Sequence, residues 1–122
     1  MLREIARVLR PRGRLLLDLL NREYALAGFA PSVQRVEQDG TLIVEQRRFD
    51  ALGSRLSVSF VIVSPSGERT DSPGHSLQLY TLTELARMLE ESGLRLDRVF
   101  GGYDASDYAL ESPRMVAVAR VT

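Results

Sequence analysis

The first 21 residues constrain the fold of this chain more than any other stretch, because they read as a helix, a stop and a strand. Apolar residues at positions 2, 5, 6 and 9 recur at helical spacing and predict a helix over residues 3–10. Pro11 ends this helix, since proline lacks an N–H group and restricts the residue before it. Residues 15–20 then form an apolar run interrupted only by Asp18, which is typical of a strand covered on both faces. The stretch therefore predicts one layer of a doubly wound α/β sheet.

Composition excludes several classes of protein. The chain has 122 residues, which is enough for one domain with a real core but not for two. Basic and acidic residues balance at 16 each, so we expect no nucleic-acid partner and no attraction to an anionic membrane. There is no cysteine, no apolar run of the roughly 20 residues that a membrane span needs, and no signal-peptide pattern. We therefore expect a cytoplasmic protein without a structural metal site.

The middle of the chain, residues 33–80, has the pattern of an antiparallel meander. Strands are predicted at 33–38, 41–49 and 55–64, with a fourth within 68–80. Asp39-Gly40 predicts a two-residue type I′ hairpin turn, because glycine tolerates a positive φ. The preceding segment, 21–32, is predicted to be a loop with one helical turn.

The remaining residues again alternate helix and strand. Thr81 and Glu84 match a capping box at the start of a predicted helix over 82–92, and Gly93 is suited to its end. Strands are predicted at 94–100 and 114–121. The last strand is nearly all apolar and should be central in its sheet.

Three segments resemble the class I S-adenosylmethionine (SAM)-dependent methyltransferases. The sequence Leu-x-Glu-Ile-x-Arg-Val-Leu-x-Pro-x-Gly-x-Leu-Leu-Leu, at 2–17, looks like the region just before their fifth strand. Residues 79–94 resemble the helix before the sixth strand, and 102–106 with 112–119 resemble the last β-hairpin. The resemblance covers essentially the whole chain, but only the carboxyl-terminal half of the family's fold.

This resemblance implies a specific fold class. It is α/β, with a partial Rossmann-like methyltransferase sheet of three strands and two helices and an inserted antiparallel β-meander. The last strand should lie antiparallel between the other two, which leaves the first strand with an unpaired edge. We expect a single domain over 1–122, with the α/β part at 1–32 and 81–122 and the meander at 33–80.

The cofactor half of the family's fold has no counterpart in this sequence. A class I methyltransferase needs a glycine-rich turn after its first strand and an acidic residue on the next strand, and neither pattern occurs. Gly101-Gly102 follows a late strand and leads into no helix pattern, so we interpret it as a turn. We expect no cofactor on the isolated chain, with SAM bound only if a complementary half exists. The sequence identifies no catalytic residue.

Candidate substrate-binding residues gather near the end of the first predicted strand. Asp18 and Asn21 lie at its carboxyl end, where open α/β sheets bind ligands. Local pairing or capping is the alternative role for Asp18. The resemblance places four loop residues on the same rim, although tyrosines in such loops commonly serve packing: Tyr24, Tyr103, Asp104 and Tyr108.

His75 is the only histidine and completes the candidate set. Its imidazole titrates near neutrality and could act as a base, but no partner acid is recognisable in the sequence. We expect His75 to begin a strand directly after Pro73-Gly74.

Three functions agree with these patterns. The chain could be a truncated or split methyltransferase half that is inactive alone and works with a separate cofactor-binding half. It could instead be a non-catalytic, self-associating domain that binds a small molecule or a protein. An intact methyltransferase with an unconventional cofactor site is disfavoured by the missing glycine-rich turn. The unpaired apolar edge at 15–20 also predicts a two-fold homodimer.

Overall fold

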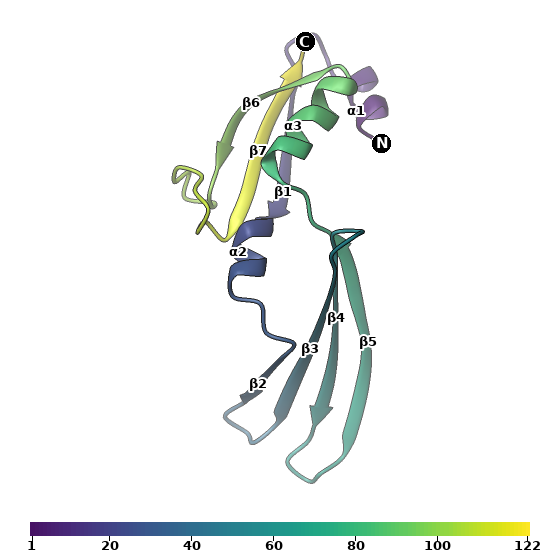
Figure 1. The fold of residues 1–122 in the computed structure, drawn as a ribbon, viewed down its shortest axis with the longest axis vertical. Coiled ribbons are helices and arrows are strands. Elements are labelled where there is room, and N and C mark those ends of the chain that lie inside the picture. Colours follow the sequence, from purple (N-terminus) through teal and green to yellow (C-terminus); the bar gives the residue numbers. More distant parts are fainter. The chain divides into compact units, whose positions relative to one another are not determined.

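The computed structural model describes residues 1–122, which form two compact units (Figure 1). The first unit, Met1–Gly28 with Tyr80–Thr122, contains α1 (Leu2–Val8), β1 (Arg14–Leu20), α2 (Arg22–Ala27), α3 (Leu82–Glu91), β6 (Leu94–Phe100) and β7 (Arg114–Val121). The second unit, Phe29–Leu79, contains β2 (Ser32–Val36), β3 (Leu42–Asp50), β4 (Arg55–Val63) and β5 (Arg69–Gln78). That the whole chain is a single domain stays a prediction.

The first unit is built on a three-stranded sheet in the order β1-β7-β6, with β7 antiparallel to both neighbours. This confirms the fold class and the central place of the last strand. Leu15, Leu17 and Leu19 of β1 lie opposite Ala119, Ala117 and Met115 of β7. These residues form the core face of the sheet, on which the apolar sides of α1 and α3 pack. Figure 1 shows α3 alongside β7.

The opposite side of the same sheet, called the open face below, is less covered. It carries the alternate residues of each strand: Arg14, Leu16 and Asp18 of β1, Val116, Val118 and Arg120 of β7, and Arg95, Arg98 and Phe100 of β6. Leu16 is 63% exposed, so the prediction that β1 is covered on both faces was wrong. The physical reason is that α1 and α3 both pack on the core face. In addition, β1 pairs only with β7, and its other edge has no partner strand.

The helices follow their predicted capping signals. The Thr81 hydroxyl accepts from the amide of Glu84 at 3.1 Å, while the Glu84 carboxylate accepts from the amide of Thr81 at 2.9 Å. Gly93 follows α3 with φ +84°. A short third helix, α2, has six residues and lies in the segment where the sequence predicted a loop with one helical turn. No helix combines the length and the hydrophobicity that a bilayer crossing requires.

The second unit is an antiparallel sheet in the order β2-β3-β4-β5, which confirms the predicted meander. The turn between β2 and β3 differs from the prediction. Gly40 has φ +91° and donates to the carbonyl of Glu37 at 3.0 Å, whereas Asp39 does not adopt a positive φ. A type I′ turn requires a positive φ at both residues. The connection is therefore a longer loop, closed by the bond from the amide of Glu37 to the carbonyl of Thr41 at 2.8 Å.

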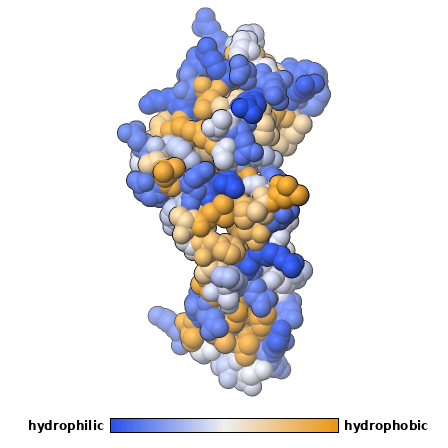
Figure 2. Space-filling model, in the orientation of Figure 1, coloured by the Kyte–Doolittle hydropathy of each residue, from blue (hydrophilic) through white to orange (hydrophobic).

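A bulge interrupts β5. His75 pairs with Val58, and the next pair is Ser72 with Phe60, so two residues of β5, Pro73 and Gly74, lie opposite the single residue Ser59 of β4. His75 consequently lies inside β5 instead of beginning a strand. Gly74 is required here, because a Cβ atom on it would lie 1.7 Å from the carbonyl oxygen of Val58. On the side of the meander visible in Figure 2, apolar side chains lie between hydrophilic edges.

Candidate functional site

Asp18 is held by two side chains from the far end of the sequence. The Tyr103 hydroxyl donates to its Oδ2, and Arg114 donates to its Oδ1 from Nε at 3.0 Å and from a terminal nitrogen at 2.9 Å. Arg114 is the first residue of β7 and pairs with Leu20, so the antiparallel register brings its guanidinium back along β1 to Asp18. Tyr103 lies in the loop after β6. The site therefore forms where β1 ends and β7 begins.

These contacts set the charges of the site. The hydrogen bond from Tyr103 lowers the pKa of Asp18 below its ordinary value of 3.8, and Arg114 acts in the same direction. The same hydrogen bond raises the pKa of Tyr103 above 10.0. At neutral pH the carboxylate is ionised and the phenol keeps its proton, which makes Asp18 a weak base. Its side chain is 35% exposed, and a carboxylate accepts up to about four hydrogen bonds, so it retains capacity for a ligand's donor group.

Asn21 is fully buried and joins the end of β1 to the loop before β7. Its side-chain nitrogen donates to three backbone carbonyls, those of Ala109, Leu110 and Ser112, at 3.2, 3.1 and 2.7 Å. Its side-chain oxygen accepts from the Tyr108 hydroxyl at 2.9 Å and from the amide of Glu23 at 3.2 Å. Asn21 thus caps α2 and fixes the position of Tyr108 in one arrangement.

The loop between β6 and β7, residues 101–113, is held by further internal contacts. The Ser112 hydroxyl accepts from the amide of Ala109 at 2.9 Å. Gly101 packs so closely on Ser112 that a Cβ atom would lie 2.3 Å from the Ser112 Oγ. The amide of Gly101 also donates to the carbonyl of Ser106 at 2.8 Å. These contacts define the backbone that presents Tyr103 and Tyr108.

The structure joins Asp18 with Tyr103 and Asn21 with Tyr108, but it gives the other candidates separate settings. Tyr24 lies on α2, is 48% exposed and forms no hydrogen bond. Asp104 accepts from the amide of Ser106 at 3.2 Å, and hydrogen bonds from Ser106 lower the pKa of Asp104. His75 belongs to the second unit and forms no side-chain hydrogen bond or ion pair. Their substrate-binding roles stay predictions.

Sequence reasoning missed Arg114 and Ser112. Arg114 is a charged residue at the start of an otherwise apolar strand, and that contrast was the available signal. Only the register of β1 and β7 shows that it reaches Asp18. No group of three histidine, aspartate or glutamate side chains gathers in a way that could hold a metal ion.

Comparison with known proteins identifies the fold. No family profile and no curated protein sequence matches the chain. Among solved structures, the CcbJ methyltransferase from Streptomyces caelestis is similar, with TM-score 0.87 and 21% identity over 99% of this chain and 51% of that one. A SAM-dependent methyltransferase from Clostridium acetobutylicum gives TM-score 0.80 and 11% identity over 98% and 49%.

A third similar structure is SAM-bound CalS10, an amino pentose methyltransferase from Micromonospora echinaspora, with TM-score 0.60 and 15% identity over 99% and 49%. The chain thus spans about half the length of these structures. Its fold is that of about half of a SAM-dependent methyltransferase, which confirms the resemblance.

Proposed function

We propose that this chain is the substrate-side half of a SAM-dependent methyltransferase and that it works with a cofactor-binding half. The observation that carries the proposal is the unpaired edge of β1 in a fold that matches half of several such enzymes. An apolar strand with a free edge is suited to pairing with a further strand. The exposed Leu16 on the open face adds apolar surface that a second half would cover.

The residues described here do not form a SAM site by themselves. The connection from β1 to α2 contains no glycine, and the side chain of Asn21 already accepts a hydrogen bond from the first turn of α2. The carboxylate of SAM would have to displace that cap to bind there. We therefore assign cofactor binding to the complementary half and propose that the isolated chain is inactive.

The contribution of this half would be to bind the methyl acceptor. Asp18, ionised and partly exposed, can accept a hydrogen bond from an amine or hydroxyl group of a small molecule. Arg114 and Tyr103 keep the carboxylate in place, and Asn21 with Tyr108 fixes the neighbouring loop. CalS10 acts on an amino pentose, and an acceptor with amine and hydroxyl donors would suit Asp18 in the same way.

Calorimetric titration with SAM tests this proposal. Residues 1–122 alone should give no binding heat, whereas the same residues joined to the polypeptide encoded immediately upstream should bind SAM at one site. Binding to residues 1–122 alone, at one site per chain, would overturn the division of labour. Failure of a folded combined polypeptide to bind SAM would overturn the methyltransferase proposal itself.

The free edge of β1 also supports a second candidate, a non-catalytic domain that self-associates. Two copies could pair their β1 edges around a two-fold axis and cover Leu16 at the same time. This candidate predicts a stable homodimer that does not dissociate when a cofactor-binding half is added. The methyltransferase proposal predicts that the added half competes with the dimer for the same edge.

A further inference from the structure

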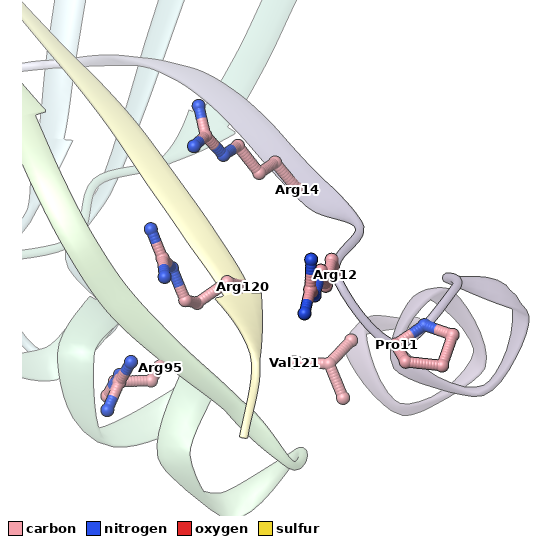
Figure 3. Close-up of a pocket in the computed structure, with 6 residues that line it drawn as sticks. All are labelled: Pro11, Arg12, Arg14, Arg95, Arg120 and Val121. Carbon is pink, nitrogen blue, oxygen red and sulfur yellow. The ribbon is translucent and has the colours of Figure 1, made fainter.

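Three arginines form a row across the open face of the first unit, at the end of the sheet away from Asp18. Arg120 of β7 lies directly opposite Arg14 of β1 on one side and Arg95 of β6 on the other. Figure 3 shows the three side chains on neighbouring strands, and those of Arg14 and Arg120 extend in the same direction. Like charges placed directly opposite each other in a sheet destabilise it. The row therefore places positive charge side by side on three strands, and an anion bound there would reduce the repulsion.

A pocket of about 310 Å³ adjoins this row. Its walls include Arg12, which lies in the turn before β1, together with Pro11 and Val121. The volume is at the lower end of the range for small-molecule sites, about 300–1,000 Å³. The pocket is therefore large enough for one small ligand. Four guanidinium groups and the two apolar side chains, Pro11 and Val121, form its walls.

The protein itself neutralises little of this charge. Arg120 pairs with Asp97 at 2.8 Å, and it is the only arginine of the pocket in an ion pair. The Nε of Arg120 is buried and has no hydrogen-bond acceptor. A buried donor without a partner is costly, and few occur in folded proteins. Both observations leave positive charge and one buried N–H donor available to an anionic ligand.

We propose that the pocket binds a small molecule through a phosphate group. Arginine presents its donors as a planar fork that matches phosphate oxygens, and a phosphate offers enough acceptors to contact several guanidinium groups at once. An anion there would remove the repulsion along the row and give the Arg120 Nε an acceptor. Pro11 and Val121 leave room for an organic group attached to the phosphate. The site is separate from Asp18 and does not depend on the proposed methyltransferase function.

Titration of residues 1–122 with pyrophosphate, inorganic phosphate and phenyl phosphate at low ionic strength tests this proposal. Binding should be followed by calorimetry and by NMR of the arginine Nε–H groups. We expect one site per chain, a shift of the Arg120 Nε–H signal, and tighter binding of pyrophosphate than of phosphate. Tighter binding of phenyl phosphate than of phosphate would identify an organic phosphate as the ligand class, and the reverse order would identify an inorganic one.

Variants separate a built site from general charge attraction. Arg95→Gln and Arg14→Gln should each weaken pyrophosphate binding roughly tenfold, the usual effect of losing one charged hydrogen bond. Arg48→Gln is the matched control, since it removes the same charge from an exposed position on β3. Equal weakening in all three variants would overturn the proposal, as would the absence of binding by a chain whose circular dichroism shows it to be folded.

Discussion

The side-chain nitrogen of Asn21 donates a 2.7 Å hydrogen bond to the backbone oxygen of Ser112, 91 residues further along the chain. The bond is buried, and the same nitrogen also reaches the carbonyls of Ala109 and Leu110. One side chain therefore fixes the loop before β7 against the end of β1. The sequence predicted Asn21 as a substrate-binding residue, and these contacts give it the structural role of holding the loop before β7 in place.

Replacing Asn21 should be among the most destabilising changes in the first unit. Asn21→Ala removes a fully buried amide and leaves three carbonyls without this donor, so we expect a loss of about 3 kcal/mol in the free energy of unfolding. Tyr108→Phe removes one hydrogen bond to the same side chain and should cost about 1 kcal/mol. Urea denaturation measures both. A larger loss for Tyr108→Phe than for Asn21→Ala would contradict this assignment.

Asp18 should make the stability of the first unit depend on pH in the acid range. Its pKa is lowered in the folded protein, so its contribution is complete above the unfolded value of 3.8 and is lost as pH falls through the lower folded value. Asp18→Asn should therefore be less stable than the parent chain at neutral pH. The difference should shrink as the pH falls from about 5 to about 2.

Thermal unfolding over this pH range provides the measurement. Asp107→Asn is the control, because the carboxylate of Asp107 is exposed and forms no ion pair. A difference between Asp18→Asn and the parent that stays constant with pH would show that the carboxylate contributes through packing instead of charge.

Gly74 and Gly40 should respond very differently to the same substitution. Both have a positive φ, which costs a residue with a Cβ about 1–2 kcal/mol. At Gly40 a Cβ atom would meet only Pro65, at 3.7 Å, so Gly40→Ala should show that conformational cost alone. At Gly74 it would collide with the backbone of Val58, and Gly74→Ala should break the pairing of β4 with β5. Equal melting temperatures for the two variants would show that the bulge is absent.

The isolated chain should be a dimer at micromolar concentration, as the free edge of β1 and the exposed Leu16 indicate. Leu16→Lys should shift the equilibrium to the monomer by placing a charge on the face that a second copy would cover. Leu52→Lys is the control, since Leu52 lies in a turn and is 97% exposed. Sedimentation equilibrium distinguishes these outcomes, and a parent chain with only the monomer mass would end the dimer proposal.

Sequence alone determined the features that depend on neighbouring residues. The capping box of Thr81 and Glu84, the positive φ of Gly93 and the order of strands and helices follow from local chemistry and from apolar periodicity. The apolar residues on both faces of β7 correctly predicted its central place, but the same pattern in β1 did not, because β1 lies at an edge and Leu16 is exposed. The turn at Gly40 was located correctly, but its type depends on the conformation of Asp39, which composition does not fix.

Tertiary structure decided everything that depends on register. Arg14, Arg95 and Arg120 are far apart in the sequence, and they form a row only because three strands pair at those positions. The contact of Arg114 with Asp18 arises in the same way. The apolar pattern of a strand shows which of its residues share a face. It does not show which residue of a distant strand lies opposite each of them, because the packing of the whole sheet sets that register. For that reason the sequence showed candidate side chains, and the fold decided which of them meet.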